Sequence, residues 1–473
     1  MSAADQHLLS QLAPETWRKL SSQQRTRCIW RIGERRLKLA VPRLVSLLEQ
    51  GEAMQDYCLA YAIGRCGDVG ALEAMHFLQQ RSKHDAVRRM ALHAWLQLAD
   101  AVQRQQYFNN LLDSWPARLR SAWQAEDEVG VHEALKTLNE NGWQTLLFSN
   151  WLEQLDQVAT EQPFASKILL TIVRTVALKP GVFRALRHLY KAAEFRADAE
   201  IFGILHQRFE TTPGSVPHGN RWVSVERRYV RYMDEVVRAD SRVAYSATTR
   251  DYLRRRSWRT LRRLAVDDAP AFINMAVGAL LAMHDRDAAP VNEQANSRHG
   301  SRLYGPYSRW LLLNRLLHTT DDWHCNRLGS SWYRFTPLAE NHARQEAFAE
   351  IWDQHPDALL NLLEHSQCQA VHAFAARALT DNPSFCSQIG LPVLANLLHS
   401  PYLSTARFAF QLCRQRFENS QLEHRWLLLM LQSNLPEAHQ YALDSISRNA
   451  LAYCADTPLL LVIICSPSEL VRS

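Results

Sequence analysis

The chain has 473 residues, of which 47% are hydrophobic and 22% charged, and its formal net charge is +6. This composition is that of a folded protein in water, and the length exceeds one ordinary hydrophobic core, so we expect several domains or an extended array of repeats. Low glycine content and abundant Leu, Ala, Arg and Gln favour helix over sheet.

The cysteines and the apolar runs indicate the compartment. The nine cysteines are odd in number and scattered, and they contain no CxxC pair, which is typical of buried single thiols in a reducing environment. The first residues lack a basic stretch followed by an apolar run, and the longest apolar run, Leu459 to Cys465, is too short to span a bilayer. We therefore expect a cytoplasmic protein.

Residues 1–115 contain an internal repeat with a spacing of 31 residues. Each unit predicts a helix with small apolar residues, a turn and a second helix, and we expect the small residues to let the second helix approach closely. Such pairs bury their apolar faces by stacking on neighbours. The segment Gln55 to Gly64 resembles a HEAT repeat. The repeated positions are Cys28, Ile29, Ile32 and Gly33, then Leu59, Ala60, Ile63 and Gly64, and more loosely Met90, Ala91, Ala94 and Trp95.

Residues 116–220 keep a helical periodicity, but the repeat becomes irregular. Pro180-Gly181 marks a helix break, and Val182 to Glu210 predicts one long or two short helices. Thr211 to Asn220 holds two Pro and two Gly, which predicts a loop and a possible boundary. The expected apolar stripe comprises Phe183, Leu186, Leu189, Ala193, Ile201, Ile204 and Leu205.

Residues 221–343 are predicted to form an Arg-rich helical centre with a long loop insertion. Arg227 to Arg263 holds 12 Arg and 4 acids, so its positive excess is larger than the net charge of the whole chain. If 252–264 is helical, its buried stripe consists of Leu253, Ser257, Leu261 and Leu264, with arginines outside and flanking. The candidate anion-binding residues are Arg254, Arg255, Arg256, Arg259, Arg262, Arg263 and Trp258.

Three partners of these arginines stay open. A guanidinium offers a fixed fork of donors and stacks on aromatic rings, which suits nucleic acid or another polyphosphate. The arginines alternatively pair with acids on neighbouring helices of this chain, with Trp258 in the core, or with an acidic protein partner. Because like charges on one helix repel each other, we expect a counter-charge nearby.

The rest of the centre contains a predicted helix at Ala269 to His284, a polar loop at Asp285 to Arg309, and a short helix at Trp310 to Leu317. The irregular stretch that follows holds Asp321 and Asp322. The chain has no GxSxG, HExxH, P-loop or kinase motif, so we predict no catalytic residue. The alternative is a DNA-directed enzyme of the HEAT-like glycosylase type, in which Asp321 or Asp322 supplies the carboxylate and Trp310, Trp323 and Trp332 line a pocket.

Residues 344–473 contain the clearest repeat. Ser366, Ser400, Ser433 and Ser466 are 34, 33 and 33 residues apart, and each follows an apolar pair or run. The pattern predicts a helix, a turn at the serine, and a second helix. The last repeat is incomplete, so we expect that the natural protein is longer, that the chain is truncated, or that a partner covers this end.

His365, Cys368 and His372 have a spacing that suggests a metal site. Structural zinc takes four N or S ligands, usually in tight pairs on loops, whereas these residues occupy ordinary helix positions of the repeat. We therefore predict buried structural residues, no metal and no cofactor.

Three further stretches carry a resemblance: Tyr190 to Asp198, Tyr252 to Leu264 and Glu346 to Asp353. Over roughly residues 180–380 the chain resembles bacterial HEAT-repeat proteins, some of which also carry a WGR domain; no WGR motif is visible in this chain. The resemblance implies a binding scaffold and, by analogy, a subunit of a bacterial defence or stress complex. We predict an all-α, right-handed α-solenoid: a non-enzymatic scaffold or adaptor that binds a protein partner and offers an Arg-rich surface to nucleic acid or another anionic ligand.

Overall fold

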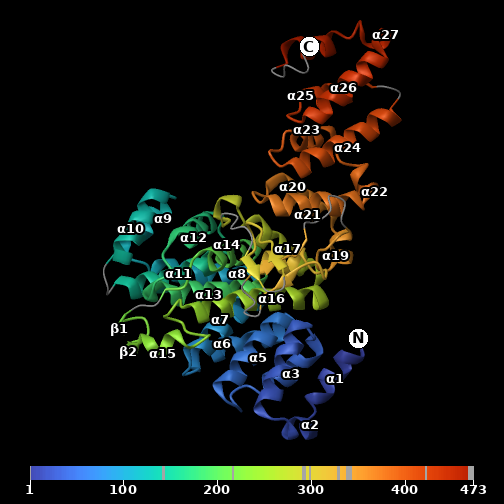
Figure 1. Ribbon diagram of the computed structural model, residues 1–473. Coiled ribbons are helices and arrows are strands. Elements are labelled where there is room, and N and C mark those ends of the chain that lie inside the picture. Colours follow the sequence, from blue (N-terminus) through green and yellow to red (C-terminus); the bar gives the residue numbers. More distant parts are fainter. Residues whose placement is uncertain are drawn as a thin grey trace. The chain divides into compact units, whose positions relative to one another are not determined.

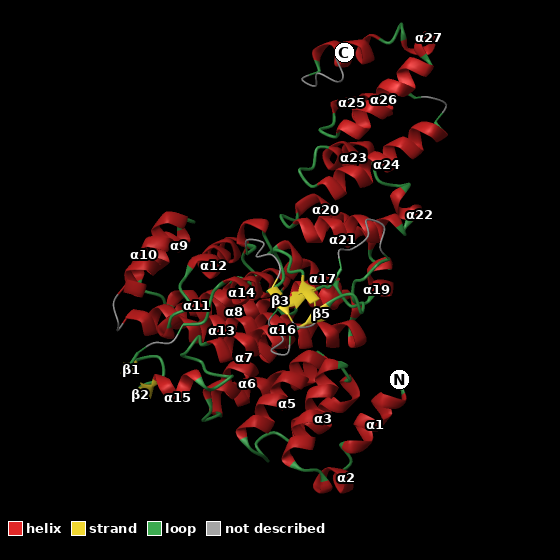
Figure 2. Cartoon of the chain, in the orientation of Figure 1, coloured by secondary structure: helices red, strands yellow, loops and turns green. Residues whose placement is uncertain are grey.

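The computed structural model describes residues 2–140, 144–215, 218–289, 295–297, 300–326, 331–336, 343–420 and 423–466. This part of the chain is mostly helical, with 28 α-helices and three two-stranded sheets (Figure 2). It forms two compact units, the first comprising residues 1–205, 214–252 and 266–268, and the second residues 206–213, 253–265 and 269–473. The four finer segments expected from the sequence stay predictions. Within the described ranges, no helix combines the length and apolarity needed to cross a membrane.

The N-terminal helices of the first unit pack against one another in pairs (Figure 1). Two of them begin at serines, because Ser2 and Ser21 each accept a hydrogen bond from the backbone N–H three residues ahead and thereby satisfy a free donor of the first turn. The helices are α1 (Ala3–Gln11), α2 (Pro14–Lys19), α3 (Ser22–Glu34), α4 (Val41–Ser46), α5 (Ala53–Cys66), α6 (Leu72–Arg81), α7 (Asp85–Leu98) and α8 (Ala101–Asp113).

The small residues of this repeat bring together different helices from those expected. A Cβ atom added to Gly33 of α3 would lie 2.6 Å from Cα of Ala62 on α5, and one added to Gly64 of α5 would lie 2.9 Å from Cα of Ala94 on α7. The close approach therefore joins the first helices of successive units, rather than the two helices of one unit. The repeated apolar positions themselves are buried, as predicted, apart from Trp95, which is half-buried.

The next helices along the chain lead to the Arg-rich segment. Ala197 adopts a left-handed backbone conformation and separates two helices, so the stretch predicted as one long or two short helices is two. All seven residues of its predicted apolar stripe are buried. The helices are α9 (Ala117–Gln124), α10 (Glu128–Glu140), α11 (Gln144–Val158), α12 (Pro163–Thr175), α13 (Pro180–Arg196) and α14 (Ala199–Thr211).

The first half of the Arg-rich segment is not a plain helix. Strands β1 (Asn220–Val223) and β2 (Arg228–Arg231) form an antiparallel hairpin, and the short helix α15 (Tyr232–Val236) follows. Together with the turns that end at Ser246 they form a small lobe, called here the hairpin lobe (residues 220–246). Its own apolar core contains Val223, Val225, Val230, Tyr232, Val243 and Ala244.

The second half is helix α16 (Ala247–Asp267), followed by α17 (Ala269–Leu281), which ends three residues before the predicted end. The polar loop predicted at Asp285 to Arg309 contains the short strands β3 (Ala295–Ser297) and β4 (Gly300–Arg302), and the irregular stretch after it contains β5 (His324–Cys325) and β6 (Trp332–Tyr333). Between them lies α18 (Leu311–Leu317), where a helix was expected.

In the C-terminal region, turns at three of the spaced serines each join two helices. In three successive turns the repeated serine accepts a hydrogen bond on Oγ from the backbone N–H two residues ahead, at 3.2 Å for Ser366 and 3.3 Å for Ser400 and Ser433. This local bond explains why serine recurs. The helices are α19 (Ala349–Asp353), α20 (Pro356–His365), α21 (Gln369–Thr380), α22 (Pro383–Cys386), α23 (Leu391–Leu398), α24 (Leu403–Asn419), α25 (His424–Gln432), α26 (Pro436–Arg448), α27 (Ala450–Tyr453) and α28 (Thr457–Cys465).

Candidate anion-binding site

Helix α16 has the two faces that the sequence predicts. Its stripe of Leu253, Ser257, Leu261 and Leu264 is buried. On the other side Arg255, Arg259 and Arg262 are exposed, whereas Arg256, Arg263 and Trp258 are half-buried. Arg255 and Arg262 make no hydrogen bond or ion pair with any residue that the structure describes. These two arginines are therefore available to an external anion.

Arg254 differs from its neighbours because its side chain is only 3% exposed. Its Nε donates to Oε2 of Glu210 on α14 at 2.7 Å, and its Nη2 donates to the carbonyl oxygen of Arg309. Glu210 also accepts from the backbone N–H of Leu312, and Nε2 of His206 lies 3.3 Å from its Oε1. Arg254 thus belongs to a buried polar cluster, and for this residue the intramolecular pairing is the interpretation that the geometry fits.

The ionisation of Glu210 depends on its neighbours in this cluster. Burial alone would raise the pKa of Glu210, but the neighbouring His206 and the Arg254 guanidinium lower it to about 2. The carboxylate therefore stays ionised at neutral pH and provides the counter-charge that a buried guanidinium requires.

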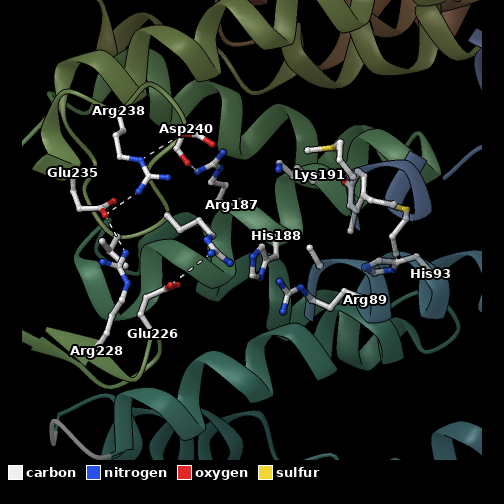
Figure 3. Close-up of a pocket in the computed structure, with 17 residues that line it drawn as sticks. Arg89, His93, Arg187, His188, Lys191, Glu226, Arg228, Glu235, Arg238 and Asp240 are labelled. Carbon is white, nitrogen blue, oxygen red and sulfur yellow. Dashed lines mark hydrogen bonds and ion pairs between the residues drawn. The ribbon is translucent and has the colours of Figure 1, made fainter. Parts of the chain in front are cut away.

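A second arginine cluster lies in a cleft of the first unit that the sequence did not reveal (Figure 3). The cleft has a volume of about 330 Å³ and is bordered by α5, α7, α13 and the hairpin lobe. Six cations line it: Arg89 of α7, Arg187 and Lys191 of α13, and Arg228, Arg238 and Arg242 of the lobe. The last three come from the predicted Arg-rich segment, but from its first half rather than from the residues singled out in α16.

Three acids line the same cleft and hold the lobe arginines. Glu235 accepts from Arg228 at 3.0 Å, from Arg238 at 3.3 Å and from the hydroxyl of Ser241 at 2.9 Å. Burial raises the pKa of Glu235, but the bonds from Arg228 and Ser241 outweigh this effect and lower the pKa below its usual value. The second acid, Glu226, forms ion pairs with Arg184 and Arg242, and the third is Asp240.

Arg187 fixes the lobe to α13. Its side chain is buried, and Nη1 donates to the backbone carbonyl oxygens of Asp240 and Ser241. The guanidinium also lies over the ring of Tyr252, with 5.8 Å between the guanidinium carbon and the ring centroid. These contacts hold one wall of the cleft in place without using a carboxylate.

Arg89 is the cation of the cleft whose guanidinium is not bonded to a neighbouring residue that the structure describes. Within the described ranges it makes no hydrogen bond and no ion pair, and burial lowers its pKa. Counting the lining residues at neutral pH, six cations face three carboxylates, which is an excess of three positive charges. The carboxylates of Glu153 and Asp85 offset part of the charge of Arg89 without bonding to it. A partly buried guanidinium whose N–H donors have no acceptor is destabilising unless an anion joins it.

Two histidines in the cleft stay neutral. Nδ1 of His188 lies 2.7 Å from Oε1 of Glu153, while burial, partly opposed by Glu153, lowers the pKa of His188 to about 4. Burial and the nearby Arg196 lower the pKa of His93 to about 3. Because Glu153 is ionised, the neutral ring of His188 carries its hydrogen on Nδ1, so Nε2 is a hydrogen-bond acceptor.

The residues of the enzyme alternative lie elsewhere. Asp321 and Asp322 are exposed, and the indole Nε1 of Trp323 donates to Gln345 at 2.9 Å. Trp310 and Trp332, which were expected to line a pocket, are 3% and 6% exposed. Buried tryptophans favour a packing role, and the use of Asp321 or Asp322 in a reaction stays a prediction.

Of His365, Cys368 and His372, whose spacing suggested a metal site, the last two are buried. Cys368 is fully buried, His365 is exposed, and His372 contacts the Ser366 carbonyl oxygen at 2.9 Å and the Thr405 hydroxyl at 2.7 Å. In the part of the chain that the structure describes, no group of three or more His, Cys, Asp or Glu residues is arranged to hold a metal ion.

Comparison with known proteins identifies no family. No family model matches the chain, and no curated protein matches it significantly. The structure shows a large, mostly helical protein with many packed helix pairs, and this is the part of the resemblance that it supports.

Proposed function

We propose that the chain is a non-enzymatic scaffold of HEAT-like repeats, arranged as a right-handed α-solenoid, that binds a protein partner through an anionic group of that partner. The repeated helix pairs of residues 1–115 and 344–473 support the scaffold. So do the tryptophans, because Trp115, Trp123, Trp151, Trp352 and Trp426 are all buried among helices and fill the interior.

One observation supports an anionic ligand: the residues lining the cleft carry an excess of three positive charges, and Arg89 makes no hydrogen bond or ion pair with the described residues. Guanidinium groups bind carboxylates and phosphates through charge-assisted, often bidentate hydrogen bonds. An anion seated in the cleft would satisfy Arg89 and reduce the repulsion among the other cations. The outer face of α16, with Arg255, Arg259 and Arg262, offers a second anion-binding surface, and nucleic acid is the ligand proposed for it.

The test of the cleft is thermal unfolding with increasing inorganic phosphate, against sodium chloride at matched ionic strength. A ligand at about 20 times its Kd stabilises the folded state by about 1.8 kcal/mol. We expect phosphate to raise the Tm of the wild type above that in chloride, and Arg89→Met to lose this difference. The matched control is Arg174→Met, because Arg174 is exposed at the end of α12, away from the residues that line the cleft. An equal phosphate effect in Arg89→Met and wild type would refute the proposed cleft.

A further inference from the structure

We infer that the anionic group bound in the cleft is a phosphate monoester on a side chain of the partner polypeptide, as in phosphoserine or phosphothreonine. This inference rests on the proposed function and narrows it to one ligand class.

Charge is the first argument. A phosphorylated side chain carries about −1.5 to −2 at neutral pH, whereas a carboxylate carries one negative charge. The excess of three positive charges in the cleft is offset more fully by the phosphate. Because the cleft is partly enclosed by α7, α13 and the hairpin lobe, solvent screens the uncompensated charge incompletely.

The second argument is the direction from which the cations come. Arg89 projects from α7, Lys191 from α13, and Arg238 and Arg242 from the hairpin lobe, so cations line different walls of the cleft (Figure 3). A phosphate monoester presents three oxygens around a tetrahedral centre and accepts hydrogen bonds from several sides. A carboxylate presents two oxygens in one plane and matches a single guanidinium best.

The third argument is the acceptor beside the cations. Nε2 of the neutral His188 accepts hydrogen bonds and would repel a bare anion. A phosphorylated residue within a polypeptide brings a donor close to its phosphate, namely a backbone N–H. The presence of Arg89 and His188 in one cleft therefore suits an anionic group that has a hydrogen-bond donor beside it, as a phosphorylated peptide segment has.

The last argument is the apolar part of the lining of the cleft. Met90 and Val243 are buried in its wall, Tyr57 is half-buried, and Met54 is 62% exposed. Methionine adapts to differently shaped apolar partners. The volume of about 330 Å³ lies at the small end of ligand pockets, which gives room for one phosphorylated side chain and part of one apolar neighbour.

The experiment is fluorescence anisotropy with a labelled seven-residue peptide, Gly-Ala-Leu-Ser-Leu-Ala-Gly, with the serine phosphorylated, unmodified, or replaced by glutamate. Hydrogen bonds to charged groups contribute about 1.5–3 kcal/mol, so we expect the phosphorylated peptide to bind at least about tenfold more tightly than the glutamate peptide. Arg89→Met should weaken its binding at least about tenfold, Arg174→Met should leave it unchanged, and Met54→Ser should weaken it only a few-fold.

The outcomes separate the two proposals. If phosphate stabilises the protein through Arg89 but the phosphorylated and glutamate peptides bind equally, the phosphate-monoester inference fails and the anion-binding cleft stands. If neither phosphate nor any peptide depends on Arg89, both fail. Tighter binding of adenosine diphosphate than of the phosphorylated peptide would overturn the inference in favour of a nucleotide. Should Arg89→Met fail to fold, Arg242→Gln at the half-exposed rim provides the same comparison.

Discussion

Residues 227–246 and helix α16 follow each other in the chain, and both are rich in arginine, but their arginines are held differently. In the hairpin lobe the acids come from the same short stretch, since Glu235 binds Arg228 and Arg238 seven and three residues away. In α16 the buried Arg254 is paired with Glu210, 44 residues earlier in the chain, and the exposed Arg255 and Arg262 have no polar partner among the described residues.

The difference shows that arginine content alone does not define a binding surface. A buried arginine with an ionised acid stabilises the fold, and its loss should mostly affect stability. A half-exposed arginine beside an acid shapes a site, and a fully exposed one mostly affects the binding of external anions. The predictions below test this ranking, from the largest expected effect on stability to the smallest.

The largest effect should follow from Glu210→Gln. This change leaves the buried Arg254 charged without a counter-charge, which typically costs about 3–5 kcal/mol. Urea unfolding followed by circular dichroism measures the loss. The double variant Glu210→Gln/Arg254→Met should recover part of it, because it removes both charges. A Glu210→Gln loss below about 1 kcal/mol would show that Arg254 is not held by this pair.

The pH dependence of the same pair provides the next test. The pKa of Glu210 is about 2 in the folded state, below its ordinary value of 4.5. Its contribution to stability is therefore complete above pH 4.5 and is lost as the pH falls toward 2. The free energy of unfolding should fall more steeply over this range in the wild type than in Glu210→Gln. Parallel curves for the two proteins would contradict the pKa.

A smaller effect is expected in the hairpin lobe. Glu235→Gln weakens the bonds to Arg228, Arg238 and Ser241, but both arginines reach water, so the loss should be about 1–2 kcal/mol. The same variant should weaken phosphate-dependent stabilisation, because it loosens the wall of the cleft. Asp234→Asn is the control, since this acid is exposed beside Arg231 and should change stability by less than about 0.5 kcal/mol.

The smallest effect on stability is expected for Arg255→Ala/Arg259→Ala/Arg262→Ala, about 0.5 kcal/mol or less for each exposed position. Its effect should instead appear in binding to labelled single- and double-stranded DNA and RNA across a salt series. Wild-type affinity should fall steeply with salt, and the triple variant should show a shallower slope, by about one for each phosphate that its side chains no longer neutralise. No wild-type binding at about 100 mM salt would rule out nucleic acid as the ligand of this face.

The sequence predicted the features that depend on local spacing. The stripe of α16 follows the helical period, and the repeated serines mark turns because each hydroxyl bonds a backbone N–H two residues away. The β1–β2 hairpin was missed, although the aromatic and β-branched pairs Trp222-Val223 and Tyr229-Val230 were a weak signal of strands. The many charged residues of the segment obscured this strand signal.

The cleft could not be predicted for a different reason. Arg89, Arg187 and Arg242 are separated by 98 and 55 residues, and nothing in local periodicity indicates that α7, α13 and the lobe meet. The partner of Arg254 was likewise beyond local reasoning, although a counter-charge was expected from repulsion along the helix. Pairings between residues far apart in the chain depend on the tertiary arrangement of the helices. The spacing of residues in a single sequence does not reveal that arrangement.

The close contacts of Gly33 and Gly64 also account for where the regular N-terminal array stops. The equivalent position in the third unit is Trp95, whose ring lies 5.6 Å from that of Tyr107 on α8 and 5.9 Å from that of His76 on α6. An indole at this place keeps the next helix at a distance that glycine would not require. The size of the residue at this position, glycine in two units and tryptophan in the third, thus limits how many units stack in the same way.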